Sequence, residues 1–109
     1  MSELTDLIVA KKILHLAQSA KDRNLEFDLS FKTVKRLLSV KKCYYTNIEF
    51  EETGANSRTI DRIDASIGYV ENNVVACTQS INNKKVNLTV DEIMLLARKI
   101  KQHKTYSKK

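Results

Sequence analysis

Apolar residues recur at helical spacing near the start of the chain. Between Glu3 and about Lys21 they lie three or four positions apart, which places them on one face of a helix. The residues of this predicted face are Leu7, Ala10, Ile13, Leu14 and Ala17. Ser2 can cap the first turn. We therefore predict an N-terminal helix that packs against the core along this face.

A second amphipathic helix is predicted from Phe31 to about Val40, with Ser30 as its N-cap. Three apolar residues share its inner face, and three basic residues share the outer one. The inner residues are Val34, Leu37 and Leu38, and the outer ones are Lys32, Lys35 and Arg36. The basic face is either a solvated surface or a contact for a polyanion, because both need the same pattern.

The C-terminal helix has the clearest predicted start. Thr89 and Glu92 have the spacing of a capping box, and Leu88 and Ile93 can close a hydrophobic staple around it. The predicted apolar stripe of this helix consists of Ile93, Leu96, Ala97 and Ile100. The basic tail after His103 is expected to be a frayed end that can also touch phosphate.

Shorter elements are predicted between positions 43 and 86. The segment CYYTNIEF is typical of a turn and a short strand, EETGANS of a polar loop, and RTIDRID of a second strand. A turn around Gly68 then leads through a short apolar run, VVA, to a helix in TQSINNKK. The predicted order is therefore strand, loop, strand, helix.

Together these elements predict a single α+β domain. A chain of 109 residues that is 42% hydrophobic can bury one core and is too short for two. We divide it into a helical part at 1–42, a ββα core at 43–86, a C-terminal helix at 87–104 and a basic tail at 105–109.

Charge and targeting signals narrow the expected partners. The formal net charge of +6 favours a polyanion such as nucleic acid, although solubility alone would also explain it. The first residues lack the pattern of a signal peptide, and no apolar run approaches the ~18 residues that cross a bilayer. We therefore expect a cytoplasmic protein without membrane contact, in which Cys43 and Cys77 stay reduced.

Two side chains of the central segment are suited to a metal ion. Asp61, on a predicted strand, and Asn82, on the following helix, are hard oxygen ligands of the kind that Mg²⁺ binds while keeping most of its waters. Lys85 lies one helical turn after Asn82 and could hold a neighbouring phosphate. The spacing alone also fits a plainer explanation, in which Asp61 and Asp64 flank a turn and Asn82 is an exposed helix residue.

The order of several short motifs favours the metal site. The pieces TIDRID, GYVENNVV and INNKK, with FDLS and CYYTN upstream and LTVDEIMLLA downstream, resemble the phage-type His-Asn-His endonucleases, or ββα-metal nucleases. The resemblance covers about the last three quarters of the chain. It implies a small ββα-metal core, DNA as the partner, phosphodiester hydrolysis as the activity, and Mg²⁺ or Mn²⁺ as the cofactor.

The resemblance also implies roles for individual residues. Asp61 takes the place of the metal ligand at the strand end, and Asn82 takes that of the helix-borne ligand. Asn73 corresponds to the middle Asn, which braces the loop between strand and helix. Lys85 matches the basic residue that follows the motif.

Three arginine and lysine residues are further candidates for phosphate contacts. Arg58 lies beside the strand, Lys84 lies beside the motif Lys, and Arg62 stands where the family usually has its general-base His. Arginine stays protonated, so Arg62 cannot accept a proton from water, but it can clamp a phosphate. The metal alone, or a carboxylate such as Asp64 or Glu71, would then have to activate the water.

The chain departs from the family pattern at its histidines and cysteines. His15 is expected at the edge of the core and His103 at a helix end, and neither has a sequence relation to the motif. Relatives often carry paired Cys-x-x-Cys knuckles, whereas here Cys77 falls one place out of frame. We therefore expect no structural zinc, a buried thiol at Cys77, and a core held by apolar packing of the flanking helices.

Two functions from different classes follow. A metal-dependent endonuclease is favoured by the presence of Asp61, Asn73 and Asn82. A catalytically inactive module of the same fold, which binds DNA or a host protein as a phage regulator or inhibitor, is favoured by the missing His. A purely structural domain with a basic surface is a third explanation.

Overall fold

Two helices and a short strand form the N-terminal layer of the computed structural model, which describes residues 4–103. Helix α1 spans Asp6–Asp22, strand β1 spans Phe27–Asp28 and helix α2 spans Phe31–Ser39. The N-cap of α1 is Thr5, so the predicted cap at Ser2 was wrong. Ser2 itself and the basic tail at 105–109 lie outside the described residues.

The buried face of α1 differs from the predicted one. Val9, Leu16 and Ala20 are buried, whereas Leu7 and Leu14 are 63% and 70% exposed. Both sets have helical spacing, and apolar residues occur on more than one side of this helix. The periodicity therefore identified a helix without determining which side of it faces the core.

Helix α2 follows the prediction closely. It begins after the N-cap Ser30, whose hydroxyl oxygen accepts a hydrogen bond from the backbone N–H of Thr33 at 3.1 Å. Val34 and Leu37 are buried, and the three predicted basic residues of the outer face are exposed. Here all apolar residues except the first lie on one side, so the burial pattern was unambiguous.

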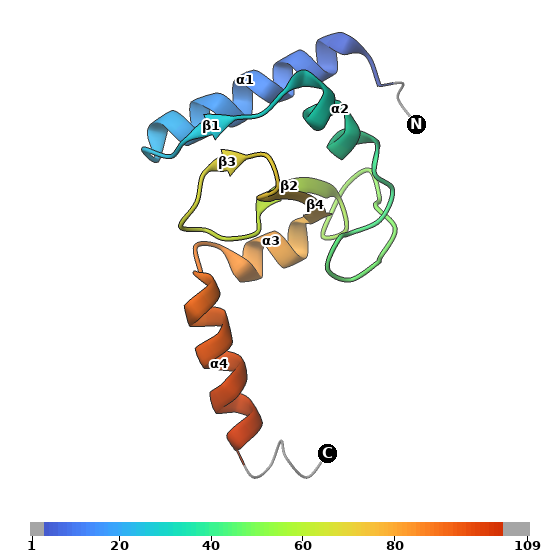
Figure 1. The fold of residues 1–109 in the computed structure, drawn as a ribbon. Helices are drawn as coiled ribbons and strands as arrows, with labels where there is room; N and C mark the ends of the chain where they lie inside the picture. The colour runs from blue at the N-terminus through green and yellow to red at the C-terminus, as the bar shows by residue number, and fades with distance from the viewer. Residues whose placement is uncertain (1–3, 104–109) are drawn as a thin grey trace.

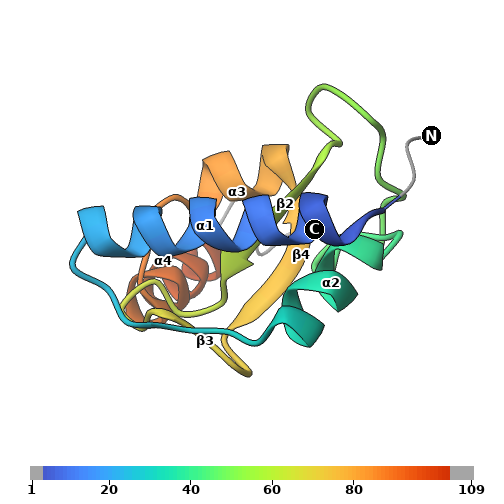
Figure 2. The same cartoon turned by 90° about the horizontal axis from the view of Figure 1, so that it is seen from above.

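An antiparallel pair of strands lies at the centre of the molecule. Strand β2, Arg58–Arg62, pairs with strand β4, Val74–Thr78, and Asp61 lies opposite Val75. All five residues of β4 are buried. Helix α3, Gln79–Lys85, follows β4 directly, and the pair of strands lies between α3 and the N-terminal helices (Figure 1). Seen from above, α1 crosses in front of the two strands (Figure 2). The strands and α3 form the predicted ββα arrangement.

The first strand of that arrangement was predicted in the wrong place. The segment at 46–50 forms no strand and contributes one isolated bridge, Lys42 with Glu49. The partner of β2 is instead the apolar run that includes VVA. Its five consecutive buried residues are typical of a strand covered on both faces.

A second small sheet joins the N-terminal layer to the centre. Strand β1 pairs in parallel with strand β3, Tyr69–Val70, and the backbone N–H of Tyr69 donates to the carbonyl of Glu26 at 2.8 Å. Gly68 lies so close to this carbonyl that an added Cβ would be 2.2 Å from the oxygen. Only glycine allows the two backbones to approach this closely.

One hydrophobic core holds these elements together. It draws on α1, α2, the β1–α2 connection and the central strands, through Val9, Leu16, Ala20, Leu29, Val34, Leu37, Ile60, Tyr69 and Val74. Within residues 4–103, no helix combines the length and the apolar character needed to cross a membrane.

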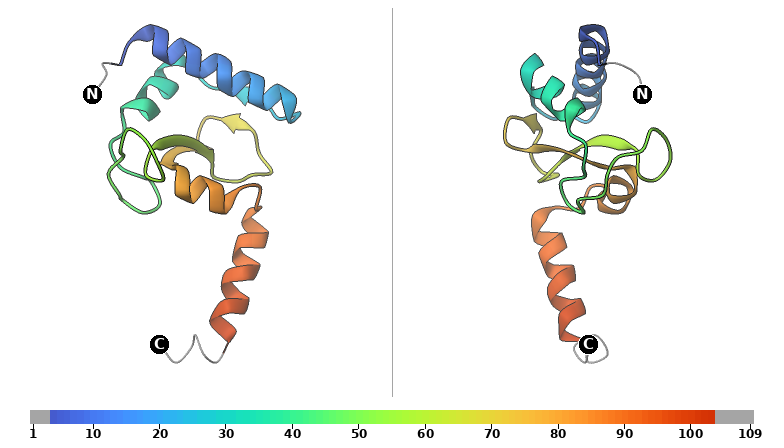
Figure 3. Two further views of the ribbon diagram at one scale, coloured as in Figure 1. Left: turned by 180° about the vertical axis from the view of Figure 1, so that it is seen from behind. Right: turned by 90° about the vertical axis from the view of Figure 1, so that its right-hand side faces the viewer.

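Helix α4, Val90–Gln102, projects away from this core (Figures 1 and 3). The predicted capping box is present: Thr89 accepts from the backbone N–H of Glu92 at 3.1 Å, and the Glu92 carboxylate accepts from the backbone N–H of Thr89 at 2.9 Å. None of the helix residues is buried. The expectation that this flanking helix helps to hold the core was therefore wrong.

Candidate functional site

A polar cleft of about 450 Å³ opens between β2, α3 and the end of α1. Its polar lining consists of Arg23, Asp61, Arg62, Asn82, Asn83 and Asn87. The two predicted metal ligands, one from a strand and one from a helix, therefore line the same cleft.

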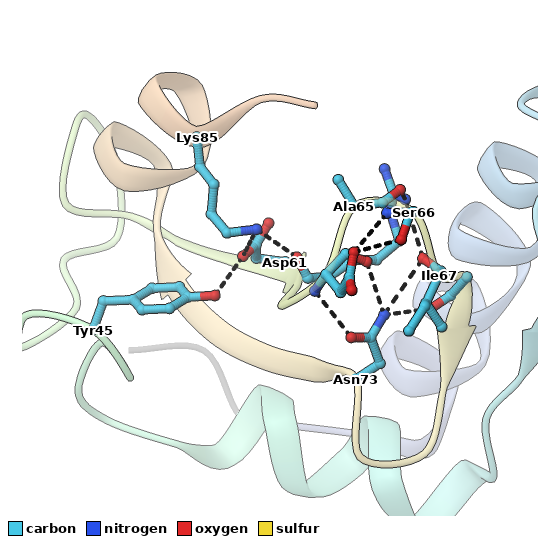
Figure 4. Close-up of polar contacts among 10 residues, drawn as sticks. Tyr45, Asp61, Ala65, Ser66, Ile67, Asn73 and Lys85 are labelled. Carbon is cyan, nitrogen blue, oxygen red and sulfur yellow. Dashed lines mark hydrogen bonds and ion pairs between the residues drawn. The ribbon is translucent and has the colours of Figure 1, made fainter. Parts of the chain in front are cut away.

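Asp61 is 5% exposed and carries the main negative charge of the cleft wall. Its Oδ2 atom accepts a hydrogen bond from the Tyr45 hydroxyl at 2.8 Å and lies 3.3 Å from the ammonium nitrogen of Lys85 (Figure 4). Burial and the nearby carboxylate raise the pKa of Tyr45, so its hydroxyl stays protonated and donates. The carboxylate is thus held in one orientation by two donors.

Lys85 is directed inward. Its ammonium donates to the carbonyl of Arg62 at 2.7 Å, and its side chain is 10% exposed. A buried carboxylate without a counter-ion is destabilising by several kcal/mol, and Lys85 supplies that counter-ion. A phosphate contact by Lys85 stays a prediction, and it requires the ammonium to leave this pair.

The donor atoms of the cleft fit a hydrated hard cation. The Asp61 carboxylate and the Asn82 amide are oxygen ligands of the kind that Mg²⁺ or Mn²⁺ takes. Among residues 4–103, no three His, Cys, Asp or Glu side chains gather into a cluster, so water would have to complete the coordination. An ion would bind through the other carboxylate oxygen or displace the Lys85 ammonium from Oδ2.

Cys43 and Cys77 are buried free thiols, as predicted for Cys77. Burial, together with the Asp61 carboxylate, raises the pKa of Cys77 to about 12, which keeps it a neutral thiol. A neutral, buried thiol is a poor metal ligand, because the thiolate is the form that coordinates.

Arg62 lies at the cleft wall but uses its donors on the protein backbone. It is 6% exposed, and its guanidinium donates to the carbonyls of Ala65 and Ile67, the latter at 3.2 Å. The guanidinium also lies over the Tyr69 ring, 5.5 Å from the centroid. In this arrangement Arg62 shapes the loop at 63–68, and the predicted phosphate clamp would need it to exchange these partners.

Asn73 braces the same loop with both ends of its amide. Its oxygen accepts from the backbone N–H of Asp64 at 3.0 Å, and its NH₂ group donates to the carbonyl of Gly68 at 2.9 Å (Figure 4). The loop joins two strands, β2 and β3, whereas the resemblance implied a loop between strand and helix. The side chain is 7% exposed, so its role is to hold the backbone beside the cleft.

The two carboxylates considered as alternative bases have other partners. Glu71 accepts from the Thr33 hydroxyl at 2.6 Å and from the backbone N–H of Ser30 at 3.1 Å, so it caps α2. Asp64 accepts from the hydroxyl and the backbone N–H of Ser66, and these hydrogen bonds lower its pKa. Neither carboxylate lines the cleft.

The remaining predicted residues lie outside the cleft lining. Arg58 donates twice to the carbonyl of Val40, at 2.7 and 3.0 Å, and stacks over the Phe50 ring at 5.0 Å. Lys84 is exposed on α3. His15 is exposed on α1, so its predicted place at the edge of the core was wrong.

Two cleft residues were not anticipated from the sequence. Arg23, the C-cap residue of α1, is exposed and lines both the cleft and a shallow depression beside His15. Tyr45, which fixes the Asp61 carboxylate, comes from the long loop between α2 and β2. Both reach the site across long sequence separations, and no local spacing signals such a contact.

Comparison with known proteins finds viral relatives of unassigned role. No family model and no solved structure matches the chain. It is 28% identical over 87 residues to an "Uncharacterized 29.0 kDa protein in dda-modA intergenic region" of Enterobacteria phage T4, a match that covers 79% of this chain and 35% of that protein. It is 27% identical over 99 residues to "Uncharacterized protein R423" of Acanthamoeba polyphaga mimivirus, covering 91% and 18%. The chain thus spans about a third and about a fifth of the lengths of these relatives.

Proposed function

We propose that the chain is a metal-dependent endonuclease of the His-Asn-His type that hydrolyses DNA phosphodiester bonds at the cleft. The observation that carries this proposal is that Asp61 and Asn82, from different elements, line one polar cleft. The motif order and the net charge of +6 support it further.

In this proposed function the side chains in and around the cleft have different roles. Asp61 and Asn82 hold Mg²⁺ or Mn²⁺, which, when bound, stabilises the negative charge that develops on the phosphate. Tyr45 orients the Asp61 carboxylate, and Asn73 keeps the neighbouring loop in place. Arg23 is the exposed cation at the cleft, and it attracts the DNA backbone.

A nicking assay with neighbouring asparagines tests the proposal. Purified protein is incubated with supercoiled plasmid and Mg²⁺ or Mn²⁺, with a chelator as the blank. Asn82→Ala should reduce nicking by about 100-fold or more, because it removes a ligand of the ion. Asn83→Ala is the matched control: its amide also lines the cleft, but its oxygen already accepts a hydrogen bond from the Gln79 amide at 2.8 Å, so this variant should nick nearly as the wild type does. If the folded wild type leaves the plasmid intact with both ions, the endonuclease proposal is wrong.

Metal binding can be measured without any cleavage. Mn²⁺ is paramagnetic and broadens NMR signals close to its site. We expect broadening of the backbone signals of Asp61 and Asn82 in the wild type and much less in Asn82→Ala. Uniform weak broadening over the whole surface would mean that the cleft holds no ion.

A second candidate is a DNA-binding module of the same fold without catalysis. It is favoured by the Lys85 ammonium, which already neutralises Asp61, and by Arg62, whose donors are used on backbone carbonyls. This module would bind DNA in a salt-dependent way and would not respond to Mg²⁺.

DNA binding is tested separately from cleavage. Under both candidates Arg23→Ala should weaken binding several-fold and lower the salt slope by about one charge. Lys11→Ala, an exposed residue on the same helix, is the control. If wild type and both variants show equal, negligible binding, the host-protein partner is the remaining alternative, and a pull-down from host lysate follows.

A further inference from the structure

One lysine of helix α1 is partly buried and unpaired among the described residues. Lys12 makes no hydrogen bond or ion pair within residues 4–103, and burial lowers the pKa of its amine below the ordinary value of 10.5. Taking a charged group out of water costs free energy unless an opposite charge compensates it. The neighbouring Lys11 is exposed, so water solvates its ammonium. Lys12 therefore carries a positive charge that the described chain leaves uncompensated.

Helical spacing places Lys12 on the same side of α1 as the exposed cation of the cleft. Arg23 follows Lys12 by eleven residues, which is about three full turns of a helix. Ser19, seven residues after Lys12, lies on this side too, and it lines the shallow depression together with Arg23. Lys11 lies about 100° away around the helix. We call the side with Lys12, Ser19 and Arg23 the cleft side of α1, because Arg23 lines the cleft and α1 crosses in front of β2 (Figure 2).

The two carboxylates of α1 lie away from the cleft side and have partners. Asp6 is about 120° from Lys12 around the helix, and its carboxylate lies 3.7 Å from the ammonium of Lys35. Asp22 is about 80° from Lys12 in the other direction and accepts a hydrogen bond from the Gln18 amide at 2.8 Å. The charged groups on the cleft side itself are therefore positive, which is the arrangement that contacts phosphates.

We propose that the cleft side of α1 binds the backbone of DNA that extends out of the cleft, with one phosphate at Arg23 and another at Lys12. This inference rests on the proposal that DNA occupies the cleft. Eleven helical residues span about 16 Å. Phosphates of one strand follow each other by about 3.4 Å along a duplex, so the two cations are about five base pairs apart. A phosphate at this place supplies the negative charge that Lys12 lacks.

DNA binding in the presence of a chelator tests the proposal without cleavage. The affinity for a labelled duplex is measured at several salt concentrations. Lys12→Ala should weaken binding several-fold and lower the slope of log affinity against log salt by about 0.9, the value for one phosphate contact. Lys11→Ala is the matched control from the adjacent position and should change both very little. Lys12→Arg keeps the charge and should bind as the wild type does, and circular dichroism checks that all variants are folded.

The charge of Lys12 can also be followed directly. Methyl-labelled lysine amines give separate NMR signals, whose pH dependence gives the pKa of each amine. Addition of the duplex should raise the pKa of Lys12, because a nearby phosphate favours the charged form. The pKa of Lys11 should change much less. A lysine that only packs against the helix surface would show no such change on addition of DNA.

The outcomes separate this inference from the proposed endonuclease. If Lys12→Ala and Lys11→Ala bind equally while Arg23→Ala binds more weakly, the contact at Lys12 is wrong and the cleft proposal stands. If the salt slope depends on Lys12 in a protein that does not nick plasmid, the contact stands and the endonuclease proposal is wrong. A wild type that does not bind the duplex overturns the inference.

Discussion

The cleft and helix α4 depart from the usual distribution of side chains in opposite directions. In and beside the cleft, Asp61, Arg62 and Asn73 are polar and only 5–7% exposed, whereas in α4 the apolar Met94 and Ile100 are 63% and 55% exposed. Among the described residues that are not exposed, no buried side-chain nitrogen or oxygen lacks a hydrogen-bond partner. The chain therefore completes the hydrogen bonding of the polar region by itself, whereas large apolar side chains of α4 stay exposed.

The largest expected effect comes from breaking the buried ion pair. Lys85→Met keeps the length of the side chain but leaves Asp61 without its counter-ion at 5% exposure. Such a change lowers the free energy of unfolding by about 4 kcal/mol. Urea unfolding of the wild type and the variant measures the difference.

The double variant shows whether the pair or the individual side chains matter. Asp61→Asn with Lys85→Met removes both charges, and Tyr45 can still donate to the amide oxygen. It should be more stable than Lys85→Met alone, because no unpaired charge stays buried. Additive losses from the two substitutions would mean that the ion pair is not what holds this region.

Two leucine truncations compare the core directly with α4. Leu37 is 2% exposed and packs in the core, whereas Leu96 is 49% exposed. Leu37→Ala should lower the free energy of unfolding by about 3 kcal/mol, and Leu96→Ala should change it by less than about 0.5 kcal/mol. Thermal or urea unfolding at low protein concentration measures both. A large loss for Leu96→Ala under these conditions would show that α4 packs on its own core.

A smaller effect is expected from shortening the buried guanidinium. Arg62→Lys keeps the positive charge but cannot reach two carbonyls in a fork or lie flat over the Tyr69 ring. We expect a loss of about 1–2 kcal/mol in the free energy of unfolding. Arg98→Lys, on the exposed surface of α4, is the matched control and should have almost no effect. If both variants lose the same free energy of unfolding, the contacts of Arg62 contribute no more to stability than those of an exposed arginine.

Local elements could be predicted from the sequence, because caps and amphipathic stripes act over a few residues. Ser30 starts α2 and the Thr89–Glu92 box starts α4, as predicted. Contacts between distant segments could not be derived in this way. The partner of β2 and the buried face of α1 each had a rival with an equally good pattern, and only packing of the whole chain selects between such rivals.

The residues of the candidate site also fall into two groups, those that the sequence predicts and those that depend on contacts between distant segments. The motif order predicted Asp61 and Asn82 as site residues, and both line the cleft. It could not predict that Lys85 turns inward to Asp61, because a helical lysine at that spacing can point to solvent equally well. Arg23 and Tyr45 enter from segments outside the motif, so their contribution depends on the tertiary fold.

The smallest expected effect is a pH dependence from Glu71, which joins the turn between β3 and β4 to the start of α2. Hydrogen bonds from Thr33 and Ser30 hold the pKa of Glu71 below its ordinary value of 4.5. A depressed pKa in the folded state contributes stability that is present above the unfolded value and is lost as the pH falls through the folded value. Wild type should therefore exceed Glu71→Gln in urea midpoint at about pH 7, and the two should converge as the pH falls below about 4.5. A gap that stays constant down to about pH 3 would show that the cap acts through its shape and not through the charge of Glu71.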